Sequence, residues 1–391
     1  MNDERKRENR SEGIVTQRLR DWGWTDDRDE ELAAALGEGS AAERVGEDDA
    51  GASRAAFAAA RAPARVIAQH RGEYRLMAPW GEATGLAPGR MSYRAAGRRE
   101  LPAVGDWVLI EPSRDGPATI VEILPRRSQF VRRKAGTESE QQVIAANVDT
   151  AFIVSSLNQE LRARRIERYL VAAWESGAMP VVVLTKADLC DDVEAAADPI
   201  RDVAAGAPVE VVSAVSGEGL ESLHKWLQPR HTVVLIGSSG VGKSTLVNTL
   251  AGEQLLTTRD VRAADDKGRH TTTHREIFRL SDGALLLDTP GMRELGLVEA
   301  DEGLGETFDE VAALAARCRF RDCSHTSEPD CAVRAAIAAG ELSSQRWESY
   351  DKLQKEAAWE ERRRDAGGSL AEKRKWKQIH KDLRKTPKKG S

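Results

Sequence analysis

The stretch at residues 232–250, TVVLIGSSGVGKSTLVNTL, limits the possible folds of this chain more than any other part of the sequence. It begins with an apolar β-branched run, which is typical of a buried parallel strand, and ends in a helical apolar pattern stopped by Gly252. Between the two lies Gly-x-x-x-x-Gly-Lys-Ser, the spacing of a phosphate-binding loop. This order of strand, loop and helix predicts an α/β domain that binds a nucleoside triphosphate.

The residue types of this loop fit the binding of phosphates and Mg²⁺. Its glycines let successive backbone N–H groups converge on phosphate oxygens, and the positive end of the following helix adds to that field. We expect Lys243 to reach the β- and γ-phosphates and the Ser244 hydroxyl to bind Mg²⁺. The predicted phosphate-site residues are Gly237, Ser238, Ser239, Gly240, Val241, Gly242, Lys243, Ser244 and Thr245.

The length and the charge distribution of the chain limit the number of domains and the kind of partner. A chain of 391 residues predicts two to three domains. The formal net charge of −5 combines an acidic start with a basic end, and that end fits either an anionic partner such as nucleic acid or a solvated tail. The sequence has no secretory signal and no apolar run of membrane-spanning length. We therefore expect a cytoplasmic monomer that makes no membrane contact.

The first third of the chain predicts an extension and a small barrel. Residues 1–60 form an acidic, Ala-rich extension, expected to be largely disordered apart from a short helix within 18–36 that could dock on the body. Residues 61–130 carry short strand patterns, which favour a β-barrel. An OB-type barrel that binds nucleic acid and a generic barrel fit equally well. Residues 126–136 are predicted to be a basic linker, either in contact with phosphate or solvated.

From residue 147, strands alternate with helices. This pattern predicts a mostly parallel sheet whose ligands bind at the carboxyl ends of the strands. The predicted helices of this part and of the C-terminal region cover residues 160–177, 193–205, 220–227 and 345–364.

Several short motifs lie at these strand ends. Thr185-Lys186-Ala187-Asp188 follows one strand, and the Asp188 carboxylate can accept from the N–H groups of guanine, which adenine does not present. Ser213-Ala214 follows another strand and could offer a backbone N–H to the guanine carbonyl. Asp288-Thr289-Pro290-Gly291 would hold Mg²⁺ through Asp288 and sense the γ-phosphate through the Gly291 N–H. Each motif alone would also fit helix capping or a turn.

A last motif, GRHTTT at residues 268–273, lies between the phosphate loop and the strand before Asp288. One of its threonines is a candidate Mg²⁺ ligand and switch residue, and we include Thr272 and Thr273 in the nucleotide site. The order of all these motifs is unusual, because the base-reading motifs precede the phosphate loop. Such an order predicts a circular permutation, in which the same sheet forms while the chain ends move.

This combination resembles the circularly permuted GTPases, and most closely the RsgA (YjeQ, YloQ) family of ribosome small-subunit-dependent GTPases. The resemblance covers residues 60–345 and depends on the permuted order, on GRHTTT, on DTPGMRE at 288–294 and on a Cys/His cluster. It implies GTP as substrate, with Lys243, Asp288 and Gly291 in catalytic roles. It also suggests that His270 positions water once a partner is bound, although a switch-loop surface histidine fits as well.

Two residues refine what the resemblance implies. Thr185 stands where the common GTPase motif has Asn, which removes an amide that braces the loop. Met292 stands where Ras-like enzymes place a glutamine that orients water. Because Met cannot orient water by hydrogen bonding, we expect slow intrinsic hydrolysis that an activator completes.

The Cys/His cluster lies within fourteen residues. Its three thiolates and one imidazole satisfy a closed tetrahedral Zn²⁺ shell, which is typical of a structural site, although reduced core cysteines beside an unrelated histidine would also fit. The predicted zinc ligands are Cys318, Cys323, His325 and Cys331.

The predicted architecture is multidomain α/β. After the extension and the OB-type barrel come a permuted P-loop GTPase domain at 131–300, a zinc-binding helical module at 301–365 and a basic tail at 366–391. By resemblance, the protein hydrolyses GTP on the small (30S) ribosomal subunit and its rRNA, and acts in late subunit maturation, with hydrolysis driving release. Two alternatives are an ATP-dependent small-molecule kinase with the same loop and a non-catalytic RNA-binding module.

Overall fold

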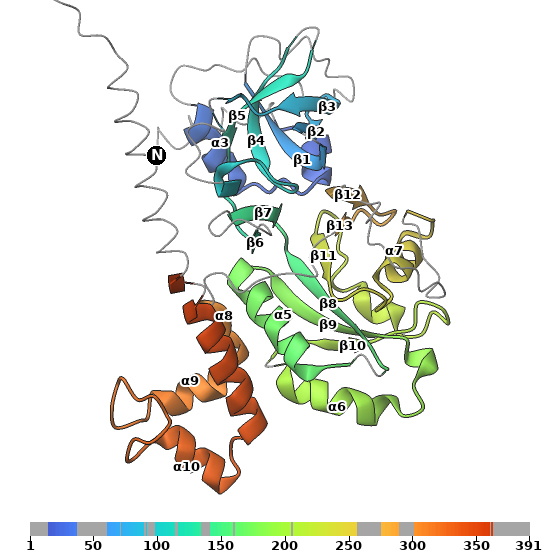
Figure 1. Cartoon of the computed structure of the whole chain (residues 1–391). Coiled ribbons are helices and arrows are strands. Elements are labelled where there is room, and N and C mark those ends of the chain that lie inside the picture. The colour runs from blue at the N-terminus through green and yellow to red at the C-terminus, as the bar shows by residue number, and fades with distance from the viewer. Residues whose placement is uncertain are drawn as a thin grey trace, which may run out of the picture.

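The chain folds into a β-barrel, a central α/β domain and a C-terminal helical module, which follow one another in space as in sequence (Figure 1). No helix of the described part combines the length and hydropathy needed to cross a membrane. The computed structural model describes residues 15–36, 61–70, 72–89, 91, 98–113, 116–133, 141–158, 161–204, 206–255, 275–288, 301–359 and 361–362.

The predicted small barrel is confirmed and is OB-like. Its strands pair in the order β1-β2-β3-β5-β4, and β4 pairs back with β1 to close the barrel. The third strand was not anticipated from the sequence, because GEATGL lacks the apolar alternation of a half-buried strand. The barrel strands are β1 (Ala62–His70), β2 (Glu73–Ala78), β3 (Gly81–Leu86), β4 (Trp107–Glu111) and β5 (Ala118–Ile123), and a 3₁₀ turn, η2 (Arg98–Glu100), precedes β4.

Residues 15–36 form two helices, α2 (Gln17–Asp21) and α3 (Arg28–Leu36), which pack on the barrel. Leu19, Trp24 and Leu32 are fully buried there. The Trp24 ring meets Trp107 of β4 edge-on, with 4.8 Å between the ring centroids. The rest of the predicted extension, residues 1–14 and 37–60, lies outside the described residues.

The predicted basic linker at 126–136 is wrong. Residues Gln129–Arg133 form a strand, β6, which pairs antiparallel with β7 (Gln141–Ala146). The arginines on either side conceal the strand in the sequence, whereas the structure buries Phe130 in the core that the barrel shares with the central domain. The domain boundary expected after residue 130 therefore falls inside this strand.

The central sheet is mostly parallel, as predicted, and only β12 runs antiparallel. Its order is β10-β9-β8-β11-β13-β12, so the strand of the phosphate loop, β11, lies in the middle although it comes fourth in the chain. The strands are β8 (Thr150–Ser156), β9 (Met179–Thr185), β10 (Val209–Val211), β11 (Thr232–Ile236), β12 (Arg275–Arg279) and β13 (Leu285–Asp288).

Three helices of the central domain match predicted segments: α5 (Ala163–Ser176), α6 (Val193–Val203) and α7 (Lys243–Ala251). Short 3₁₀ turns occur at η3 (Ala187–Leu189) and η4 (Leu220–Leu223). The helix predicted at 220–227 is wrong, because only η4 forms there before the chain turns into β11. Eight residues with a single apolar face are too few to form a helix without strong packing.

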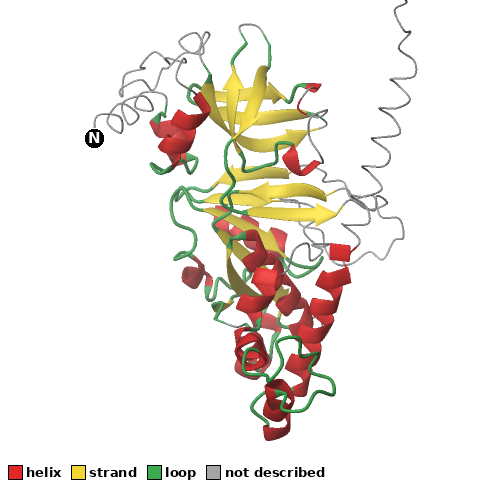
Figure 2. Cartoon of the chain, turned by 90° about the vertical axis from the view of Figure 1, so that its left-hand side faces the viewer, coloured by secondary structure: helices red, strands yellow, loops and turns green. Residues whose placement is uncertain are grey.

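The barrel and the central domain share one sheet and one core (Figure 2). The end of β1 pairs with β12 through Ala68 opposite Glu276 and Gln69 opposite Arg275. A single hydrophobic cluster contains side chains of the barrel, of α2 and α3, and of one face of the central sheet. A second cluster covers the other face, between the sheet and α7.

The C-terminal module has a core of its own. It consists of α8 (Asp301–Thr307), α9 (Asp309–Ala315), α10 (Ala332–Ala339) and a C-terminal helix at 344–359. Phe308 and Val333 are fully buried in its hydrophobic cluster, and Val171 of α5 is the central-domain residue buried with them. Gly303 of α8 is necessary for this packing, because a Cβ there would lie 2.2 Å from the Val171 carbonyl oxygen.

Candidate nucleotide site and metal cluster

The phosphate loop connects β11 to α7 at the carboxyl end of the parallel strands. Gly237, Gly240 and Gly242 all have positive φ, and a Cβ on Gly237 would lie 2.3 Å from the Val154 carbonyl oxygen. Glycine is thus required by backbone conformation at three positions and by close approach at one of them. The helix begins at Lys243, so its first N–H groups face the loop, an arrangement that favours phosphate.

Lys243 lies within the loop in the described geometry. Its ammonium donates to the Gly237 carbonyl at 2.8 Å and to the Ser238 carbonyl. Ser244 and Thr245 follow in the first turn of α7, half-buried, while Ser239 is exposed and Val241 is buried beneath the loop. The Lys243 ammonium thus lies at the loop where the sequence predicts that it contacts phosphate.

The Thr185–Asp188 segment contacts the phosphate loop directly. The buried Thr185 hydroxyl donates to the Val241 carbonyl at 2.6 Å, and the Lys186 ammonium donates to the Gly240 carbonyl at 2.8 Å. Lys186 adopts a left-handed conformation with φ of 61°, which turns its side chain toward the loop. The Thr185 hydroxyl thus braces the phosphate loop in place of the Asn amide of the common GTPase motif.

The two predicted base-reading motifs also meet. The buried Ser213 hydroxyl donates to the Asp188 carboxylate at 2.5 Å, and the hydroxyl oxygen accepts from the Ser216 N–H at 3.1 Å. Asp188 itself is exposed, so its carboxylate retains acceptor sites that face outward. Ala187, buried next to it, donates its N–H to the Val212 carbonyl.

The second motif is also tied to the helix of the phosphate loop. The Ala214 carbonyl accepts from the Thr249 hydroxyl of α7 at 3.2 Å. Both segments predicted to read the base are therefore hydrogen-bonded to the phosphate-binding region: residues 185–188 to the loop itself, and Ala214 to the helix that follows it.

Asp288 ends β13 at the same edge of the sheet. Burial raises the pKa of its carboxyl, and the nearby Lys243 ammonium opposes that rise. The half-buried Asp288 carboxylate near Lys243, together with the Ser244 hydroxyl, would provide hard oxygen ligands of the kind that Mg²⁺ prefers. The predicted site residues His270, Thr272, Thr273 and Gly291 lie outside the described residues, as does Met292.

One residue at the loop was not anticipated from the sequence. Arg165, in the first turn of α5, donates to the Ser238 hydroxyl at 2.9 Å. In the sequence it is one of several arginines on an amphipathic helix, and no spacing relates it to a loop more than seventy residues away. Only the packing of α5 beside the phosphate loop reveals the contact.

The Cys/His cluster is assembled at the tip of the C-terminal module. The ligand atoms of Cys318, Cys323, His325 and Cys331 all lie within 4.8 Å of one another. The His325 Nδ1 atom is 3.5 Å from the Cys318 sulfur and 3.4 Å from the Cys331 sulfur. Three sulfur donors and one ring nitrogen fit a closed tetrahedral Zn²⁺ shell and leave no position for a reacting water.

The loop that carries His325 is held by Glu328. This carboxylate accepts from the Ser324 hydroxyl and from the backbone N–H groups of Ser324, Thr326 and Ser327. The hydrogen bond from Ser324, followed by those from the backbone, lowers the pKa of Glu328 to about 2. The His325 ring also packs edge-on against Trp347 of the C-terminal helix, at 5.3 Å between centroids.

Comparisons with known proteins agree with this geometry. The sequence profile of the RsgA GTPase family matches residues 123–298. The chain is 46% identical over 328 residues to the small ribosomal subunit biogenesis GTPase RsgA 2 of Lactiplantibacillus plantarum. The aligned region covers 81% of this chain and 92% of the relative.

Solved structures of similar proteins support the same family assignment. The structure resembles that of YjeQ from Thermotoga maritima, with a TM-score of 0.57 and 26% identity, over 76% of this chain and 99% of the other. It also resembles YloQ, described as a circularly permuted GTPase, with a TM-score of 0.54 and 26% identity, over 77% and 96%. With its permuted sheet order, its phosphate loop and its Cys₃His cluster, the chain belongs to the RsgA GTPase family.

Proposed function

We propose that the protein hydrolyses GTP when docked on the small ribosomal subunit and acts in the late maturation of that subunit. The observation that carries this proposal is the direct bonding of the Thr185–Asp188 segment to the phosphate loop, in a chain that belongs to the RsgA GTPase family. Relatives of this chain bear the name of small ribosomal subunit biogenesis GTPase.

Guanine is selected by Asp188 in this proposal. Each carboxylate oxygen accepts more than one hydrogen bond, so the bond from Ser213 orients the group without filling it. The outward side then accepts from the N–H groups of guanine, while Lys186, held by Gly240, lies along the base. The buried Ser213 fixes the carboxylate before the base arrives, which reduces the ordering that binding requires.

The phosphates are bound by the loop N–H groups and by Lys243, which leaves the carbonyls of Gly237 and Ser238. Ser244, Asp288 and a threonine of residues 272–273 would hold Mg²⁺, which neutralises charge on the β- and γ-phosphates when bound. Gly291 contributes its N–H to the γ-phosphate, and His270 positions the attacking water once the partner is in place. Because Met292 cannot orient water, intrinsic turnover is slow.

The barrel and the C-terminal module supply the contacts to rRNA in this proposal. Zn²⁺ bound by the Cys₃His cluster would keep the module folded. Residues 265–273 and 288–294 would respond to the nucleotide and set whether the protein holds the subunit. Hydrolysis then drives release. The protein works in the cytoplasm as a monomer.

The test is multiple-turnover GTP hydrolysis with and without purified small subunits. We expect stimulation of at least about 10-fold, well within what completion of a GTPase site by a partner supplies. Asp188→Asn should weaken GTP binding and leave ATP binding unchanged. ATP that competes with GTP at equal concentration would favour the kinase alternative, and no turnover with subunits would favour a non-catalytic RNA-binding module.

A further inference from the structure

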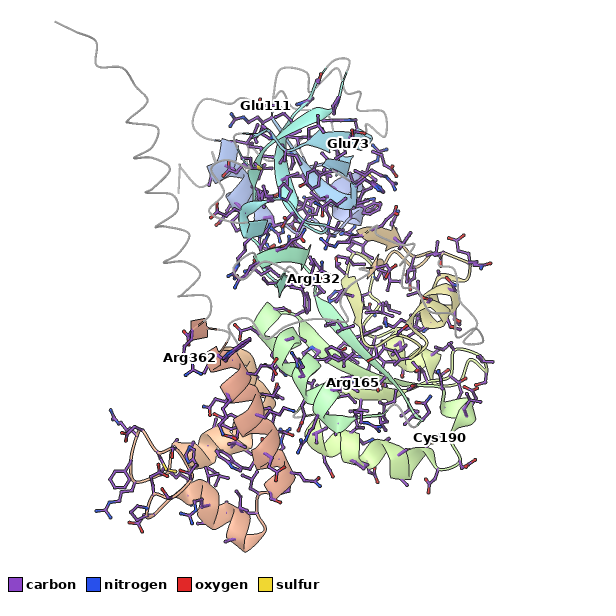
Figure 3. All side chains as sticks on the ribbon, viewed as in Figure 1. Glu73, Glu111, Arg132, Arg165, Cys190 and Arg362 are labelled. Atoms are coloured by element: carbon purple, nitrogen blue, oxygen red, sulfur yellow. The ribbon has the colours of Figure 1, made fainter. Side chains whose placement is uncertain are left out.

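We propose that Arg165 is a positioning residue of the nucleotide site and that α5 couples this site to the C-terminal module. The proposal deepens the proposed function, because it assumes that guanine nucleotides bind at the phosphate loop. It depends on the contacts that five consecutive residues of α5, 164–168, make in two directions. Figure 3 labels Arg165 on this helix, between the central sheet and the module.

In one direction, Arg165 holds the second residue of the phosphate loop. Its guanidinium donates to the Ser238 hydroxyl at 2.9 Å, and the carbonyl of the same Ser238 accepts from Lys243. The carbonyl that the lysine must leave on binding phosphate therefore belongs to the residue that Arg165 fixes. Arg165 acts on the phosphates through Ser238 and not by direct contact, which is why we call it a positioning residue.

In the other direction, its neighbours hold the C-terminal helix. Arg164 pairs with Glu348 at 3.0 Å, and Arg168 pairs with Glu356. Residues 164 and 168 lie one above the other on a helix, while residue 165 is turned about 100° from residue 164 and about 60° from residue 168. The same turn of α5 can therefore contact the loop and the module at once.

One of these contacts is buried. Glu167 of α5 is 2% exposed and pairs at 2.8 Å with Arg346 of the C-terminal helix. Arg346 also pairs with Glu310 at 2.6 Å and lies over the Phe308 ring at 4.1 Å. A shift of α5 along its axis would separate this buried pair, so the module has to follow the helix.

A double-mutant cycle tests the first half of the proposal. We expect Arg165→Ala and Ser238→Ala each to weaken binding of a fluorescent GDP or GTP analogue by about 5- to 10-fold, the net value of an ordinary hydrogen bond. The double variant should be no weaker than either single variant, because both remove the same bond. Arg165→Lys should restore part of the loss, since it keeps a charged donor.

Arg164→Ala is the matched control, because it removes a neighbouring arginine of the same turn that faces the module. Its nucleotide affinity should stay within about 2-fold of that of the natural chain. Unchanged affinity in Arg165→Ala, or effects that add in the double variant, would overturn the positioning role.

Hydrogen exchange of residues 344–359 tests the coupling. At saturating nucleotide, we compare the protection of this helix in the GDP state with that in the GTP-analogue state. This difference should be at most half as large in Arg165→Ala as in the natural chain. Equal differences in the two proteins, or no difference in the natural chain, would overturn the coupling. These measurements use the full chain without ribosomes, so they stand even if small subunits fail to stimulate turnover and the proposed function fails.

Discussion

The central domain is joined to its two neighbours in different ways. At the barrel, β1 and β12 pair within one continuous sheet, and the two parts share one hydrophobic core. At the C-terminal module, the central domain contributes Val171 to a separate core, and α5 adds ion pairs with the C-terminal helix. The barrel is therefore structurally continuous with the central domain, while the module packs against it with a core of its own.

We call the contact between the central domain and the barrel the first joint, and the contact between the central domain and the C-terminal module the second joint. A buried arginine lies at the centre of the first joint. Arg65 of β1 is about 1% exposed and donates to the Asn147 carbonyl, to the Thr232 hydroxyl at 2.8 Å and to the Trp22 carbonyl. Burial lowers the pKa of Arg65 to about 10, so the guanidinium stays charged at neutral pH. One side chain thus joins the N-terminal helices, the barrel and the strand that leads to the phosphate loop.

The second joint also has an arginine at its centre, but its partners differ. Arg346 is held by two carboxylates and a ring, at the meeting of α5, α9 and the C-terminal helix. We expect that disruption of this site would weaken the packing of the module and leave the shared sheet intact. Because the barrel shares a sheet and a core with the central domain and the module does not, we expect a conformational change to be accommodated more easily at the module than at the barrel.

Metal removal should give the largest effect. Structural Zn²⁺ sites contribute about 10 kcal/mol or more to folding, and the core of the module is small. A chelator, or Cys331→Ala, should abolish hydrogen-exchange protection across residues 301–359 while leaving the strands of the barrel and of the central sheet protected. Metal content measured in parallel identifies the ion. Cys190→Ala, at a thiol outside the cluster, is the control, and loss of barrel protection on chelation would contradict the separation of the two joints.

Arg65→Met should destabilise the barrel and the central domain together by about 3–4 kcal/mol. The substitution keeps an apolar stem but leaves two carbonyls and the Thr232 hydroxyl without a donor. Urea unfolding should show one shifted transition for both regions. Arg61→Ala, which breaks an exposed pair with Glu111, should change stability by less than about 1 kcal/mol. Two separated transitions in Arg65→Met would show that the shared sheet does not couple the regions.

Arg346→Ala should destabilise the module by about 3 kcal/mol, because it leaves the buried Glu167 carboxylate without its partner. Protection of the C-terminal helix should fall, while that of the barrel should not change. Lys355→Ala removes an exposed pair with Asp351 on the same helix and serves as the control. An equal loss of protection in the barrel would mean that the second joint is no weaker than the first.

The smallest effect is expected inside the central domain. Thr185→Val keeps the shape of the side chain and removes the hydroxyl that donates to Val241, which should weaken GTP-analogue binding by about 5- to 10-fold. Thr185→Asn should restore binding, because an amide can donate to the same carbonyl. Neither variant should alter exchange at either joint. Equal affinity in Thr185→Val would show that this bond does not hold the loop.

Local patterns were sufficient for most of the elements that carry the site. The glycine spacing of residues 237–242 encodes a backbone conformation that other residues rarely adopt, and the apolar runs before it and before Asp288 encode buried strands. The Cys/His spacing likewise indicated four candidate ligands, whose ligand atoms the structure brings within 4.8 Å of one another. In these cases, the chemistry and the local fold depend on residues that are close in sequence.

Other features could not be predicted locally. The strand β6 was concealed by flanking arginines, and β3 by a lack of apolar residues, since both are stabilised by partner strands rather than by their own composition. A helix was expected at 220–227 because its apolar spacing is helical, but the chain has to turn there to enter β11.

By itself, then, the sequence determined the permuted GTPase domain, the position of its phosphate loop and the candidate ligand set of the Cys/His cluster, because glycine, lysine, carboxylate and thiol requirements are local. Only the tertiary structure decided that Thr185 braces the loop, that Arg165 holds Ser238, and that the barrel shares a sheet with the central domain. These contacts join residues tens to hundreds of positions apart. Their energies depend on burial and on partners that exist only once the chain has folded.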